Sequence, residues 1–85
     1  MTWNTKEYNA KELEYKFLLH DVVVELEIKM KELNISEKEL AEKIDIESRK
    51  LKLFFDGDRD MSLRMLYNIC HELETDIQTI ISKIN

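Results

Sequence analysis

The feature that most constrains this chain is the absence of proline and the near absence of glycine. Gly57 is the single glycine among 85 residues. The chain therefore has almost no residue that adopts a positive φ angle without a steric penalty from a Cβ atom, and turns that need such residues are nearly absent. The sequence predicts an all-α protein.

Length and composition limit the class of protein. Eighty-five residues with 44% hydrophobic composition suffice for one domain with a single core, but a chain of this size rarely forms a deep catalytic cleft. No apolar run approaches the ~18 to 20 residues that span a bilayer, and the first residues do not resemble a secretory leader. One cysteine, Cys70, cannot form an internal disulfide. We expect a cytoplasmic protein that does not enter membranes.

The charge is unevenly distributed along the chain. The formal net charge is -5, which argues against nucleic acid, because a phosphate backbone selects for clustered lysine and arginine. Residues 1–33, 34–46 and 65–85 each carry a net charge of -2. Residues 47–64, with 5 basic and 4 acidic side chains, are the one net-positive segment.

The N-terminal third is predicted to contain a long helix. Residues 1–10 show no period and are expected to form a flexible arm, so that residues 11–85 make up a single domain. From about Lys11 to Leu33, apolar residues recur at helical spacings, and the middle of this segment is apolar nearly all round. A helix that is apolar on all sides must be covered on all sides, by the rest of the chain or by a partner.

A second helix is predicted to begin at Glu37. Ser36 and Glu39 form a capping box, in which each side chain bonds the other residue's backbone amide. Asp45 lies where the chain turns out of this helix, and aspartate tolerates the left-handed region better than most residues.

Three further helices complete the predicted bundle. The third covers about residues 48–56 and is followed by Gly57. Ser62 is expected to cap the fourth helix, and Asp76 the fifth. The second and third helices, joined by a corner of about three residues, have the geometry that places one helix in the major groove of DNA. Ala41 is small where these helices must approach closely, and Ile46, Leu51 and Phe54 are apolar where they must be anchored.

Residues 35–80, ISEKELAEKIDIESRKLKLFFDGDRDMSLRMLYNICHELETDIQTI, resemble the Cro/C1-type (Xre family) helix-turn-helix domain. The matching landmarks are Ser36, Leu40, Ala41, Glu42, Lys43, Ile46, Leu51, Phe54, Gly57, Ser62, Leu63, Leu66 and Leu73. FFDGDRDMSLRML is similar to the variant found in phage-type regulators and antitoxins. The resemblance implies a five-helix, lambda-repressor-like bundle, here with an extended N-terminal helix. It also implies a homodimer that binds double-stranded DNA at a palindromic operator, and residues 48–56 as the recognition helix.

The resemblance assigns the outward side chains of the recognition helix to base contacts. Arg49 and Lys52 can donate to guanine O6 and N7, and Ser48 can bond a base edge or a phosphate. Leu53 can contact a thymine methyl group. These residues are predicted to read the operator sequence.

Two other cations are better placed for the phosphate backbone. Lys50 and Arg59 are expected to position the protein on DNA without specifying a sequence. Glu37, Asp45 and Glu47 occupy family positions that usually hold glutamine, glycine and serine or threonine. These carboxylates weaken attraction to DNA and favour an alternative, a protein-binding inhibitor or antitoxin built on the same scaffold.

Two apolar surfaces are candidates for a dimer or partner contact. The first is an outer strip of the long helix with Phe17, Leu18 and Val22, and the second is on the last helix with Ile80, Ile81 and Ile84. Neither His20 nor His71 has a second ligand at zinc spacing. No nucleophile has a recognisable base beside it, and a glycine-rich phosphate loop is impossible. We expect no enzyme activity, metal, cofactor or small-molecule substrate.

Overall fold

The structure is a computed structural model that describes residues 5–84, with side chains from residue 10 onward. The described residues form five helices and no strand: α1 (Thr5–Leu33), α2 (Glu37–Lys43), α3 (Ser48–Phe55), α4 (Leu63–Glu72) and α5 (Ile77–Ile84). The predicted all-α class and the helix-turn-helix bundle are confirmed. None of these helices is long and apolar enough to cross a bilayer.

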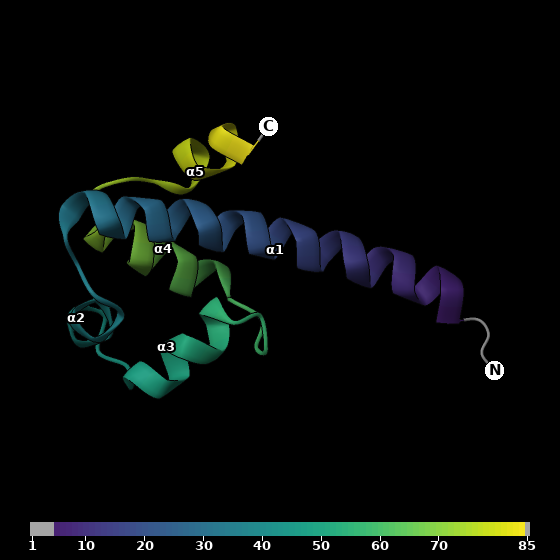
Figure 1. Ribbon diagram of the computed structural model, residues 1–85, viewed down its shortest axis with the longest axis horizontal. Coiled ribbons are helices and arrows are strands. Elements are labelled where there is room, and N and C mark those ends of the chain that lie inside the picture. The colour runs from purple at the N-terminus through teal and green to yellow at the C-terminus, as the bar shows by residue number, and fades with distance from the viewer. Residues whose placement is uncertain (1–4, 85) are drawn as a thin grey trace.

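Helix α1 runs the length of the molecule (Figure 1). Its 29 residues extend about 43 Å at 1.5 Å per residue, close to the 46 Å long axis. In Figure 1, α5 lies on one side of α1, the other helices lie on the opposite side, and the N-terminal end of α1 projects beyond them.

The predicted start of the first helix at Lys11 is wrong by six residues. The chain is already helical at Thr5, so residues 5–10 do not form the expected arm, and residues 1–4 lie outside the described part. Residues 5–10 lack apolar periodicity. They contain no proline or glycine, and each residue added to an existing helix gains a backbone hydrogen bond without a new nucleation cost.

The core forms where all five helices meet. Leu26, Leu40, Leu51, Ile69 and Leu73 are completely buried, so α1, α2, α3 and α4 each contribute to it. Ile80 of α5 joins the same cluster. Complete burial of a leucine side chain is worth about 1.5–3 kcal/mol relative to exposure, and this cluster therefore fixes the positions of the helices.

The core also contains two residues that the sequence placed on candidate interfaces. Val22 and Ile80 are buried within the chain, so their assignment to exposed surfaces is wrong. Val22 lies three residues after Leu19 and four before Leu26 on α1, on the side that faces the core. Ile80 is buried because α5 packs against α1, and Ile81 and Ile84 are half-buried against the same core.

The predicted starts of α2, α4 and α5 are confirmed by their capping bonds. The Ser36 hydroxyl accepts a hydrogen bond from the Glu39 amide, and the Glu39 carboxylate accepts one from the Ser36 amide, both at 3.1 Å. The Ser62 and Asp76 side chains accept bonds from backbone amides three residues later, at 3.0 and 2.8 Å. Helix α3 begins after Glu47, whose side chain makes no capping bond.

Four helices end in the same way. One residue shortly after each of α1, α2, α3 and α4 adopts a left-handed conformation. These residues are Asn34, Asp45, Gly57 and Glu74, with φ angles of 58°, 61°, 80° and 60°. The residue that follows each left-handed residue donates its amide to a carbonyl five positions earlier, at 2.9 to 3.0 Å. This six-residue motif satisfies carbonyls that the helix leaves without partners. Three of these four left-handed residues are not glycine, and the Cβ atom of each of these three carries a steric cost of roughly 1 kcal/mol.

Cys70 is buried in the core. Burial, with a smaller contribution from the Asp76 carboxylate, raises the pKa of the Cys70 thiol to about 11. The thiol therefore stays protonated at neutral pH, and the thiolate is the reactive form.

Substitutions at Glu74 and Gly57 test the steric cost of the left-handed conformation at the helix ends. We expect Glu74→Gly to stabilise the protein by up to about 1 kcal/mol, because glycine adopts this φ angle without Cβ strain. Gly57→Ala should destabilise it by about 1 kcal/mol, although nothing lies within 4 Å of the added Cβ, because φ is +80°. Thermal unfolding followed by circular dichroism measures both, with about 4–8 °C expected per kcal/mol. A lower Tm for Glu74→Gly would contradict the strain argument.

Candidate nucleic-acid interface

The helix-turn-helix is formed by α2, residues 44–47 and α3. Helices α2 and α3 pack against each other. Leu40 and Ala41 are the buried residues of α2, and the Ala41 side chain is small enough for the two helices to approach closely. Leu51 faces this contact and is completely buried. The packing that the sequence predicted for this motif is confirmed.

The corner between α2 and α3 has a fixed conformation. Asp45 adopts the left-handed conformation, as predicted, and the Ile46 amide donates to the Ala41 carbonyl at 3.0 Å. Ile44 and Ile46 are half-buried and pack against the core. The corner is therefore held by a backbone bond and by two apolar anchors, and it sets the direction in which α3 leaves.

Helix α3 has a buried side and an exposed side. Leu51, Phe54 and Phe55 are buried. The five candidate DNA contacts on this helix are all exposed: Ser48, Arg49, Lys50, Lys52 and Leu53. At about 100° per residue, Arg49 and Leu53 point most directly away from the core, and Lys50 and Lys52 lie on either flank. The structure thus presents all five side chains to solvent.

One of these cations has an acidic neighbour directly after the end of α3. The Lys52 ammonium lies 3.8 Å from the Asp56 carboxylate, and both side chains are largely exposed. Such a pair contributes at most about 1 kcal/mol to stability. Its importance is electrostatic, because Asp56 places a negative charge beside the outward cations of α3.

Arg59 is exposed on the loop between α3 and α4, and α1 holds this loop. The Lys16 ammonium donates to the Gly57 carbonyl at 2.8 Å. Burial raises the pKa of the nearby Tyr15 hydroxyl above its ordinary value, and the neighbouring Asp60 carboxylate raises it further. Sequence reasoning missed these anchors. The Lys16 bond spans 41 residues, and no local spacing indicates it.

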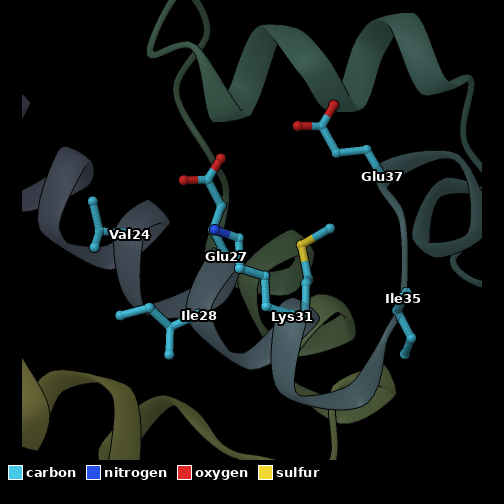
Figure 2. A pocket seen from close by; sticks show the side chains of 7 residues that line it. Val24, Glu27, Ile28, Lys31, Ile35 and Glu37 are labelled. Carbon is cyan, nitrogen blue, oxygen red and sulfur yellow. The ribbon is translucent and has the colours of Figure 1, made fainter.

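The three unusual carboxylates differ in their surroundings. Asp45 and Glu47 are exposed. Glu37 is half-buried and lines a groove beside α1 together with Glu27. Figure 2 shows both carboxylates extending over the same side of this groove. Asp45 and Glu47 are therefore the more exposed acids of the helix-turn-helix.

No cluster of three or more histidine, cysteine, aspartate or glutamate residues suitable for a metal ion occurs in the described part of the chain. His20 and His71 are both exposed. His71 stacks on Tyr67, with ring centroids 6.2 Å apart. The expected absence of a metal site stays a prediction.

Comparison with known proteins gives one likeness of fold. The crystal structure of the clp gene regulator ClgR from Corynebacterium glutamicum matches with a TM-score of 0.72 and 19% sequence identity, over 79% of this chain and 71% of that chain. No protein-family model and no curated protein matches the sequence. At this identity the likeness concerns the fold alone.

Proposed function

We propose that this protein is a sequence-specific DNA-binding regulator of transcription that places α3 in the major groove. The observation that carries the proposal is the division of α3, with three apolar residues buried and the candidate contacts exposed. An α-helix presented in this way by a fixed corner fits the width of the major groove. The likeness of fold to a gene regulator supports the same function.

Each exposed side chain of α3 has a role in this proposal. Arg49 points directly outward and is the best candidate for a bidentate contact with guanine, with Lys52 beside it. Leu53 contacts a thymine methyl group, and Ser48 bonds a base edge or a phosphate. Lys50 on the flank of α3 and Arg59 on the loop held by α1 contact phosphates.

The acidic composition sets the balance between specific and nonspecific binding. Nonspecific affinity comes almost entirely from neutralised phosphates, and the chain carries a net charge of -5. We expect weak binding to random DNA and a large share of the affinity from base contacts. Such a protein relies on its operator rather than on sliding along bulk DNA.

The proposed mechanism is repression by occupancy of an operator. The resemblance to Cro/C1-type (Xre) domains of phage or bacterial regulators supports a homodimer on a palindrome, with one α3 in each half-site. Occupancy needs no catalytic group, cofactor or small molecule, and we propose that the protein acts without them in the cytoplasm.

A second candidate function has specific support. Asp45 and Glu47 are exposed, and Asp56 lies beside Lys52, so the same surface presents carboxylates to a basic partner. An inhibitor or antitoxin would use this acidic surface to bind protein. Selection from random duplex DNA separates the two candidates, because an inhibitor yields no enriched sequence.

Arg49→Ala tests the proposed readout. We expect a loss of about 1–3 kcal/mol in binding, confined to one operator position, because a bidentate guanine contact discriminates between bases. The matched control is Lys50→Ala, which should weaken binding to all sequences about equally and reduce the salt dependence by about one charge. Selection from random duplexes, followed by affinity titration at several salt concentrations, measures both effects. An unchanged Arg49→Ala sequence profile would refute this role.

Asp56→Asn tests the effect of the carboxylate beside Lys52. Removing one charge about 4 Å from Lys52, a proposed base-contacting cation, is worth on the order of 1 kcal/mol in water, so we expect DNA affinity to rise roughly three- to ten-fold. Glu74→Gln removes one charge at a distant exposed position and should change the affinity far less. Fluorescence anisotropy with a labelled operator gives both values, and equal effects would show that only net charge matters.

A further inference from the structure

The outer face of α1 carries apolar side chains that the rest of the described chain leaves exposed or only half covers. Leu13, Phe17 and Ile28 are 52%, 65% and 44% exposed, and Val24 is half-buried. With 3.6 residues per turn, these four positions fall within an arc of about 60° on the side of α1 opposite the core. We call Leu13, Phe17, Val24 and Ile28 the outer stripe.

The outer stripe is symmetric along the helix. Leu13 and Ile28 are equally far from a point between His20 and Asp21, and Phe17 and Val24 are centred on the same point. In an antiparallel two-fold contact, residue i of one copy meets residue j of the other and the reverse also holds. The symmetry of the outer stripe therefore places apolar side chains opposite apolar side chains. In an antiparallel pair, all eight apolar side chains meet in one register.

We infer that two copies of this protein associate through an antiparallel pair of α1 helices. Leu13 of each copy packs on the partner's Ile28, and Phe17 on the partner's Val24. The two-fold axis passes between residues 20 and 21. This inference specifies the surface of the proposed homodimer, and it does not depend on whether that dimer binds DNA.

A groove beside α1 supplies the receiving site. It has a volume of about 440 Å³, and its apolar walls are Val24, Ile28, Met30 and Ile35. Figure 2 shows Val24, Ile28 and Ile35 around this space, between α1 and the start of α2. The proposed register brings the partner's Leu13 into this groove. The N-terminal part of α1, which projects beyond the other helices (Figure 1), thereby gains a packing partner.

The charges beside the outer stripe favour this register on one side. Lys16 and Glu27 lie on the same flank of α1, so Lys16 of one copy comes within two residues of the partner's Glu27. The Lys16 ammonium also donates to the Gly57 carbonyl of its own chain. The other flank carries Glu14, Asp21 and Glu25, which meet the same acids of the partner. The stripe is about 22 Å long at 1.5 Å per residue, which is short for an interface of ~1,200–2,000 Å². We therefore expect a dissociation constant on the order of micromolar.

Cross-linking tests the orientation and the register. Ala10→Cys and Lys31→Cys, each in a Cys70→Ala background, place thiols just beyond the two ends of the stripe. A short bismaleimide should join the two variants only when they are mixed, because two copies of residue 10 lie about 30 Å apart in an antiparallel pair. Cross-links within either single variant would indicate a parallel pair, and no cross-link at 200 μM protein would exclude this contact. Either result overturns the inference.

Sedimentation equilibrium tests the surface. Phe17→Glu places a carboxylate in the middle of the stripe, and we expect it to weaken dimerisation at least 100-fold with an unchanged Tm, because Phe17 is exposed in the single chain. The control is Leu63→Glu on α4, where the leucine is 72% exposed but far from the stripe in sequence. It should dimerise normally. Dimerisation of Phe17→Glu as strong as that of the unmodified protein would refute the inference.

The same variant separates this inference from the proposed function. If Phe17→Glu is monomeric and still enriches a half-site from random DNA, the α1 contact and the proposed DNA-binding function are both supported. If the unmodified protein cross-links as expected but selects no DNA sequence, the proposed function fails and the α1 contact stands. If DNA is selected and no cross-link forms, the α1 contact is wrong and DNA binding is unaffected.

Discussion

The structure depends on the burial of the inner face of α1. Leu26, in the C-terminal half of this helix, is completely buried, and α5 packs along the same helix. Helices α2 and α3 are 7 and 8 residues long, well below the ~12–15 residues at which an isolated helix becomes even marginally stable in water. They are helical because Leu40 and Leu51 reach the core that α1 helps to form, so the geometry of the helix-turn-helix is a consequence of that packing.

The sequence predicts this fold as far as local residues mark where each helix begins and ends. Helix starts follow from side chains that bond nearby amides, as at Ser36 and Asp76, and such signals are local. Helix ends rely on left-handed residues. Gly57 and Asp45 were predictable because glycine and aspartate tolerate that conformation, whereas Glu74 has no such signal and is held by the chain on either side. The early start of α1 was missed because helix extension needs no apolar pattern.

The candidate site was predictable to the extent that helical period decides exposure. The exposed positions of α3 follow once Leu51 and Phe54 are recognised as buried, and the Lys52–Asp56 pair follows from an i, i+4 spacing. The apolar positions of α1 and α5 were harder to place. Val22 and Ile80 belong to helices with apolar residues on several sides, and only tertiary packing decides which side is covered. The bond from Lys16 to Gly57 likewise depends on how α1 lies across the loop.

If the proposed DNA binding and the proposed α1 contact both hold, an acidic protein with a weak dimer contact has a physical advantage as a switch. Its low nonspecific affinity would leave most copies free in solution, where a micromolar dimer would be largely dissociated at low concentration. Two half-sites on one operator hold two copies close together, and the effective concentration between them then favours contacts that are weak in solution. Below the dimer dissociation constant, occupancy rises with the square of protein concentration. The carboxylates near α3 would then weaken the binding of a single copy to DNA, and the exposed Phe17 on α1 would stabilise two copies bound side by side. Strong binding would therefore require both copies.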